Sequence, residues 1–261
     1  MRRALQSQRG FTLLELLLAT AIFMVICAAM FGLLQISQQK YAIETQMSGS
    51  FGEARLGLDQ MVRDINISGY PSPTLLSNTS NPLNYAVSPV AWSPLYPNGN
   101  CQVAGGGCTS PTDSDLILET ESDPNVGVVW IRYQLLNGVL YRGMVPKTSG
   151  DPASAFGASG VMTPLVNNVV YNASGFLLDE INAQYPSMFP GGVQPLLFSY
   201  TCKTPTGPQP CASASTSYNI PANIVAVDVT LIVQTPQQDY QTQSLKLIEL
   251  TGRGRPTNSG N

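Results

Sequence analysis

The sequence predicts an α+β fold in which one long N-terminal helix packs on a C-terminal antiparallel β-sheet. Two patterns lead to this prediction. Helical periodicity runs from Phe11 to about Ile65, and several later segments alternate apolar with polar residues. Because a helix with one apolar stripe and a sheet with one apolar face can bury these surfaces against each other, the two patterns together favour an α+β domain.

The N-terminal part of this helix is apolar enough to cross a membrane. Residues 11–34 read FTLLELLLATAIFMVICAAMFGLL, and Glu15 is the one carboxylate among them. At 1.5 Å per residue, such a run is long enough to cross a hydrocarbon core. Three arginines, at positions 2, 3 and 9, precede the run and Lys40 follows it. The positive-inside rule therefore predicts a single pass with the N-terminus in the cytoplasm.

Other kinds of export signal fit this run less well. Ala19-Thr20-Ala21 matches a secretory cleavage site, but the apolar run continues unbroken to Leu34, where a mature chain would turn polar. A lipoprotein site at Cys27 would need small residues in place of Val25 and Ile26. A plain signal anchor carrying a periplasmic binding or enzymatic domain stays open as an alternative of a different class.

The junction before the apolar run narrows the class of protein. A short basic leader ends at Gly10, and the residues that follow, Phe11-Thr12-Leu13-Leu14-Glu15, place an acid at the fifth position of the helix. This junction resembles the type IV prepilin family. The resemblance implies a pilin fold, cleavage after Gly10 by a prepilin peptidase and methylation of the new amino group on Phe11. It also implies that the chain contacts other minor and major pilins and the inner-membrane pilus assembly machinery.

Glu15 needs a physical reason to lie in an apolar run, because a charge within a bilayer costs about 2.5 to 3.5 kcal/mol on insertion scales. The resemblance implies a partner for it, the positively charged N-terminus of a neighbouring subunit, and hence a role for Glu15 in assembly. The alternative is that Glu15 lies near the interface and stabilises the positive end of its own helix.

The helix is expected to continue beyond the membrane with one apolar face. This face is formed by Phe51, Ala54, Leu58, Met61, Val62 and Ile65. Ser68-Gly69-Tyr70-Pro71 is a helix stop. Glycines at positions 32, 49, 52 and 57 weaken the helix and favour bends or local melting.

The end of the helix carries a second, less specific resemblance. The stretch from Ala54 to Ile65, closed by Ser68-Gly69-Tyr70, is similar to minor pilins of the PilW type and to J-type pseudopilins of type II secretion. The first similarity implies a structural subunit that primes or initiates assembly of a pilus for adhesion, twitching motility or DNA uptake, and that lies at the filament tip. The J-type pseudopilin of type II secretion is the alternative.

The remaining residues predict an antiparallel sheet with irregular loops. Residues 71–112 are expected to be an irregular insertion. A hairpin is predicted in which residues 129–135 and 139–142 are joined by Asn137-Gly138. Further strands are predicted at 116–119, 166–171, 196–200, 224–233 and 244–250.

The expected organisation has five parts. Residues 1–10 are a leader, 11–34 the membrane and polymerisation half of the helix, 35–68 its extracytoplasmic half, 69–251 the globular β-sheet domain and 252–261 a frayed tail.

Composition argues against an enzyme or a nucleic-acid-binding protein. The chain contains no histidine, which removes the usual general base and the commonest metal ligand. Without the leader, 10 basic and 16 acidic residues leave a net charge of −6, so a basic face for nucleic acid is not expected. The acidic residues Asp113, Asp115, Glu119, Glu121 and Asp123 are predicted to form a solvated strand face rather than a calcium site. No cofactor or metal is predicted.

Four of the five cysteines form two close pairs, Cys101 with Cys108 and Cys202 with Cys211. Zinc knuckles usually have two to four residues between their cysteines, and both pairs here are more widely spaced. The spacing therefore favours two local disulfides in an oxidising compartment over free thiols or an all-cysteine zinc site.

Overall fold

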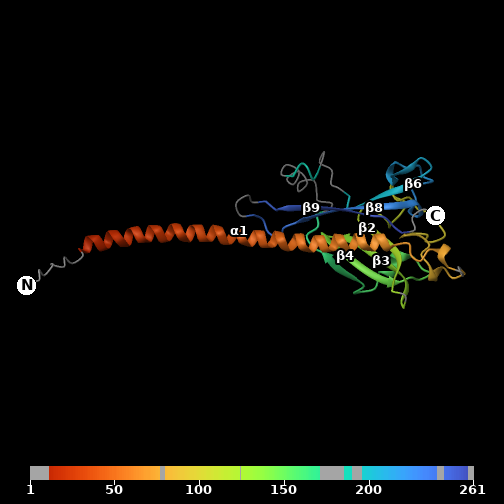
Figure 1. Ribbon diagram of the computed structural model, residues 1–261, viewed down its shortest axis with the longest axis horizontal. Helices are drawn as coiled ribbons and strands as arrows, with labels where there is room; N and C mark the ends of the chain where they lie inside the picture. Colours follow the sequence, from red (N-terminus) through yellow and green to blue (C-terminus); the bar gives the residue numbers. More distant parts are fainter. Residues whose placement is uncertain are drawn as a thin grey trace, which may run out of the picture.

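A computed structural model describes residues 12–76, 80–123, 125–170, 185–189, 196–239 and 244–257. Its first element is the 55-residue helix α1, Leu13–Ile67, which is continuous and about 80 Å long. Figure 1 shows that the N-terminal half of α1 extends away from the rest of the molecule, whereas its C-terminal half lies between β-sheets. The fold is the predicted α+β arrangement, a long N-terminal helix followed by antiparallel sheets.

Within the described residues the strands form two antiparallel sheets where the sequence predicted one. The first sheet has the order β1-β2-β3-β4-β5 and the second β7-β6-β8-β9. The strands of the first sheet are β1 Val90–Ala91, β2 Asp115–Asp123, β3 Gly127–Leu136, β4 Val139–Pro146 and β5 Met162–Val166. Those of the second sheet are β6 Phe198–Thr204, β7 Gly207–Pro210, β8 Ile224–Gln234 and β9 Leu247–Gly254.

Short helices lie between these longer elements. They are η1 Pro73–Leu75, η2 Pro82–Asn84, α2 Pro152–Ala155, η4 Cys211–Ser213 and η5 Pro221–Asn223. The described part of the predicted insertion, 71–76 and 80–112, contains η1, η2 and the two-residue strand β1, so it is largely irregular, as expected. It is held to the first sheet by backbone hydrogen bonds, among them one from Glu119 N–H to the carbonyl of Pro89, 3.1 Å.

The main core lies between α1 and the two sheets (Figure 1). From the helix, Ala54, Leu58, Met61 and Ile65 are buried in it, and Val62 packs against it. Phe51 was also predicted to lie on this face, but it is 38% exposed and that prediction is wrong. The reason is that Phe51 lies about one turn before Ala54, the first residue of α1 that the core buries.

The helix ends where the sequence predicted. Ser68 caps it, and both its backbone N–H and its hydroxyl donate to the carbonyl of Ile65. Gly69 then leaves the helix with a positive φ of 87° and donates its N–H to the carbonyl of Glu119 at 2.8 Å. The helix stop therefore also attaches the chain to strand β2.

Glycines allow α1 and the second sheet to approach closely. A Cβ on Gly254 would lie 2.4 Å from Cγ2 of Ile65, and one on Gly252 would lie 2.8 Å from Cγ2 of Val62. Gly57 plays the same part from the helix side, since a Cβ there would lie 2.4 Å from Cγ2 of Val166 in β5. Gly57 is thus a packing position within a continuous helix and does not mark a break.

Most predicted strands are present with shifted ends. The hairpin β3–β4 turns at Asn137 and Gly138, both with positive φ, as predicted. The strand predicted at 166–171 is instead β5, Met162–Val166, with an isolated bridge from Val169 to Val233, and Tyr171 lies outside the described residues.

The predicted frayed tail is wrong for its described part. Strand β9 continues to Gly254, and Arg255 N–H donates to Asn66 Oδ1 at 2.8 Å. Thr257 N–H donates to the carbonyl of Ser68 at 3.1 Å. Residues 252–257 are therefore attached to the end of α1, a long-range contact that local composition does not reveal.

Candidate functional site

The N-terminal half of α1 is an uncovered apolar surface. Its large apolar side chains are between 44% and 77% exposed, and they are Leu13, Leu14, Leu16, Leu17, Leu18, Ile22, Phe23, Met24, Val25, Ile26, Met30, Phe31, Leu33, Leu34 and Ile36. In the described part of the chain, α1 is the one helix long and apolar enough to cross a membrane. An exposed apolar surface of this extent marks a site that contacts lipid or other apolar helices.

The first turn of α1 is closed by a reciprocal cap between Thr12 and Glu15. Thr12 N–H and its hydroxyl both donate to Glu15 Oε2 at 2.9 Å, and Glu15 N–H donates to Thr12 Oγ1 at 3.3 Å. This is a capping box, which satisfies backbone donors that the helix itself leaves open. In the single chain, the carboxylate of Glu15 therefore binds the start of its own helix.

The predicted processing residues adjoin this cap. Gly10 and Phe11 lie outside the described residues, and the description begins at Thr12, the residue after the predicted new N-terminus. An amino group on Phe11 would thus be one residue from the helix cap and four residues from the Glu15 carboxylate.

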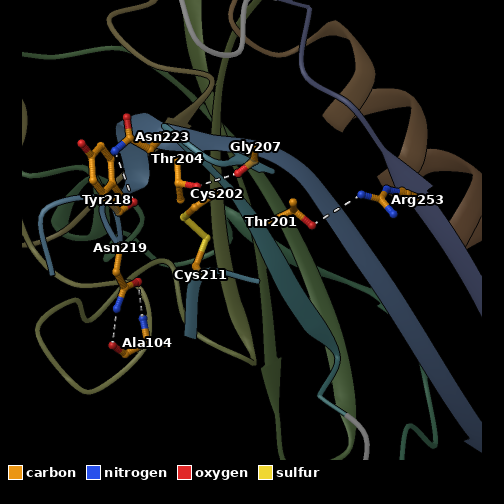
Figure 2. The surroundings of a disulfide bond; sticks show 10 residues. All are labelled: Ala104, Thr201, Cys202, Thr204, Gly207, Cys211, Tyr218, Asn219, Asn223 and Arg253. Atoms are coloured by element: carbon orange, nitrogen blue, oxygen red, sulfur yellow. Dashed lines mark hydrogen bonds between the residues drawn. A yellow bond between two sulfur atoms is a disulfide. The ribbon is translucent and has the colours of Figure 1, made fainter. Parts of the chain in front are cut away.

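Both predicted cysteine pairs lie at disulfide-bonding distance. The Cα atoms of Cys101 and Cys108 are 5.0 Å apart, and those of Cys202 and Cys211 are 4.9 Å apart. The first disulfide loop is joined to the connection between β7 and β8 by Asn219, whose side-chain amide accepts from Ala104 N–H at 3.1 Å and donates to the Ala104 carbonyl at 2.7 Å (Figure 2). Local spacing indicated the cysteine pairs, whereas this contact depends on tertiary structure.

A buried polar cluster joins α1 to the first sheet, and the sequence did not predict it. Asp64 Oδ2 accepts from Tyr133 Oη at 2.6 Å and from Arg142 Nη2 at 2.8 Å, while Asp64 Oδ1 accepts from Gln60 at 2.8 Å. Burial, followed by the charge of Asp64, raises the pKa of Tyr133, so its phenol stays protonated and donates. The cluster holds the helix in register on β3 and β4.

Two of the five acids predicted to form a solvated strand face, Asp115 and Glu119, are instead buried, so the prediction is wrong for these two. Asp113 and Glu121 are partly exposed and Asp123 is exposed. Glu119 is fully buried and accepts from Lys147 Nζ, Tyr96 Oη and, at 3.1 Å, Val87 N–H. Burial raises the pKa of Glu119, and the charge of Lys147 opposes this shift. Three partners from distant segments explain why the carboxylate faces inward.

Asp115, from the same predicted acidic face, is also buried and paired. It receives hydrogen bonds from Arg132 Nη2 at 2.5 Å and Nε at 3.1 Å, from Gln134 at 2.9 Å and from Ser110 at 3.1 Å. Arg142, Arg132 and Lys147 thus each neutralise one buried acid. Among the described residues, no group of three or more potential ligands has the arrangement of a metal site.

Comparison with known protein families gives a match at the N-terminus. Residues 5–31 match the family model described as the prokaryotic N-terminal methylation motif. The matched stretch contains the predicted cleavage junction, the Thr12–Glu15 cap and most of the exposed apolar surface. No curated protein matches the chain.

Proposed function

We propose that this chain is a minor type IV pilin, a structural subunit that primes or initiates assembly of a pilus. The methylation motif over residues 5–31 supports a type IV pilin or pseudopilin, which implies processing by prepilin peptidase and contact with pilus or secretion machinery. The PilW-like end of the helix favours the minor pilin. The motif and the pilin-like fold also favour a structural protein over an enzyme.

One observation carries the proposal: the chain leaves the apolar half of α1 uncovered while burying a separate core around the other half. Each large apolar side chain moved from water to an apolar environment contributes about 1.5 to 3 kcal/mol. The same surface serves first as a membrane anchor and then as the contact between packed helices in a filament. The sheet domain stays outside this contact and offers a surface to neighbouring subunits.

The proposed processing frees the group that drives assembly. Cleavage after Gly10 removes the three leader arginines and frees the amino group of Phe11, which is then methylated in a separate step that needs a methyl donor. Because this amine is cationic and lies in an apolar setting, it attracts a carboxylate of a neighbouring subunit strongly. Glu15 is the carboxylate of the apolar run, so assembly exchanges its hydrogen bonds to Thr12 for a pair with that amine.

The proposed location follows from the leader charge. Arginines at positions 2, 3 and 9 keep the N-terminus in the cytoplasm, the apolar half of α1 crosses the inner membrane once, and the sheet domain lies in the periplasm. An oxidising periplasm also suits the two cysteine pairs. After assembly, the subunit lies in the pilus, at or near its tip.

Mass spectrometry of the mature protein, combined with a Glu15→Ala variant, tests this proposal. We expect the protein to begin at N-methylated Phe11. Glu15→Ala should be processed equally well, yet its amount in sheared filaments should fall about tenfold or more, because removing one partner of a buried ion pair costs about 2 to 5 kcal/mol. Filament immunoblots measure this loss.

Glu44→Ala is the matched control, since Glu44 is an exposed acid on the same helix beyond the apolar run. It should enter filaments normally. A mature chain that retains Met1, or that begins after Ala21, would rule out the pilin. Normal incorporation of Glu15→Ala into filaments would contradict the pairing of Glu15 with the amine of a neighbouring subunit. Loss of protein secretion with intact pili in a deletion strain would favour the J-type pseudopilin.

A further inference from the structure

A groove on the second sheet concentrates positive charge that the overall acidity of the chain conceals. The groove has a volume of about 560 Å³ and is lined by Lys203, Thr204, Pro205, Gly207, Pro208, Val225, Ala226, Arg253, Arg255 and Pro256. The side chains of Lys203, Arg253 and Arg255 are exposed. No acidic residue is among the groove-lining residues, all of which belong to the described part of the chain.

The cations are spread along the groove. Arg253 and Arg255 are two residues apart on nearly extended backbone, which separates them by about 7 Å. Lys203 lies on β6, and β8 separates β6 from β9, so another 9 to 10 Å or so lies between the two strands. This spacing suits a partner with repeated negative charges better than a single small anion.

Both cation-bearing segments are held in place. Arg255 N–H donates to Asn66 Oδ1, and the neighbouring Gly254 packs directly against Ile65 of α1. Lys203 follows Cys202, whose disulfide to Cys211 closes the β6–β7 hairpin (Figure 2). A charged ligand would therefore meet cations whose backbones are already ordered, which lowers the entropic cost of binding.

Arg253 has only weak partners at its own surface. Its Nε lies 3.5 Å from Asp228 Oδ1 with both side chains well exposed. Its Nη2 lies 3.5 Å from Thr201 Oγ1, and Figure 2 draws the contact between these two residues. An exposed ion pair of this kind contributes at most about 1 kcal/mol. The guanidinium can therefore turn to another anion at little cost, and the Thr201 hydroxyl adds a donor of the kind that phosphates accept.

We infer that this groove binds the phosphate backbone of double-stranded DNA without reading its sequence. Duplex DNA carries one negative charge per 1.7 Å or so of its axis, so three cations at this spacing each meet a phosphate in any register. None of the residues lining the groove, which are all described, is aromatic. The groove therefore offers no aromatic ring on which the bases of a single strand could stack. This inference is independent of the proposed assembly role.

The membrane surface is a less suitable source of phosphate. The groove lies against Ile65 and Asn66, and about 45 Å of helix separates these residues from the end of the apolar run at Leu34. Electrostatic attraction decays over roughly 8 to 10 Å at physiological salt. Lipid headgroups around the anchor are thus out of reach.

Fluorescence anisotropy of a short DNA duplex with the full-length protein in detergent micelles tests the inference. Three phosphate contacts predict that log K falls with log salt at a slope of about −2.7. Arg253→Ala with Arg255→Ala should bring this slope to about −0.9 and weaken binding of every duplex sequence alike. Asp228→Asn should tighten binding, because it removes a competing anion.

Arg55→Ala is the matched control, since Arg55 is an exposed cation on α1 outside the groove, and it should bind as the wild type does. Absence of duplex binding at low salt, or an unchanged slope in the double variant, would overturn the inference. If polygalacturonate competes as strongly as unlabelled DNA at equal charge, the inference is also overturned, and the groove would be assigned to acidic polysaccharide. Because the assay needs no processing or filaments, its result is separate from that of the pilin test.

Discussion

Buried carboxylates show how a residue's role depends on partners far along the chain. Asp64, Asp115 and Glu119 each lie against one cation, and in each case the cation comes from another segment. Residue type and spacing along the chain suggested solvated acids on β2. Their inward orientation follows from Arg132 and Lys147, which a single strand does not reveal.

Glu119 gives a prediction of pH dependence. Its pKa is raised by burial, so the native state holds this proton more tightly than the unfolded chain, and the contribution of Glu119 to the free energy of unfolding falls as pH rises above about 4.5. Lys147 limits this loss. Lys147→Met should therefore destabilise the protein by about 3 to 5 kcal/mol at neutral pH, where an unpaired buried charge remains, and much less near pH 4.

Urea unfolding of the protein at several pH values measures this difference. The control is Lys147→Met combined with Glu119→Gln, which removes both charges and should show no such pH-dependent penalty. Equal destabilisation by Lys147→Met at pH 4 and pH 7 would contradict the assignment.

At the scale of elements, α1 and β9 depend on each other through glycine. The strand can lie on the helix because Gly252 and Gly254 have no side chains where Val62 and Ile65 lie. The composition of this segment, with its glycine, arginine and proline, led to the prediction of a frayed tail. In the structure the same glycines belong to a strand, where their lack of a side chain allows close packing on the helix.

Gly254→Ala should destabilise the protein by about 1 to 3 kcal/mol, since its Cβ would lie 2.4 Å from Ile65 Cγ2 and the packed core must shift. Chemical denaturation measures the loss. Ile65→Ala added to Gly254→Ala should cost less than the sum of the two single changes, because it makes room for the new Cβ.

Gly52→Ala is the control for this prediction. Gly52 lies on the exposed face of α1, nothing lies within 4 Å of a Cβ there, and alanine should stabilise the helix by up to about 1 kcal/mol. Full additivity of Gly254→Ala and Ile65→Ala would show that the two positions do not touch.

The whole molecule consists of a projecting apolar rod and a domain with its own core (Figure 1). The core uses α1 residues from Ala54 onward, so the domain does not need the first part of the helix for its packing. Removing residues 1–35 should therefore yield a folded domain that stays in solution without detergent. Circular dichroism and gel filtration check this outcome.

Removing residues 1–60 is the contrasting truncation, because it takes away Ala54 and Leu58 from the core. Loss of two buried helix side chains and of most of the helix should leave the domain unfolded or aggregated. Aggregation of the shorter truncation, lacking residues 1–35 only, would show that the apolar half of α1 is part of the domain.

Local sequence was sufficient for every feature that depends on neighbours in the chain. The apolar run, the helix stop at Ser68, the β3–β4 turn and the cysteine pairs could be predicted because chain spacing and local propensity decide them. The methylation motif is likewise a continuous stretch, 5–31. The class of protein that this motif indicates could therefore be inferred without knowledge of the fold.

Tertiary structure alone decided the features that join distant segments. These are the division of the strands into two sheets, the burial of Glu119 and Asp115, the docking of residues 252–257 on α1 and the basic groove made by β6 and β9. Their physical reason is common to all: a buried charge, a close approach or a shared surface depends on partners that folding brings together from far apart in the chain.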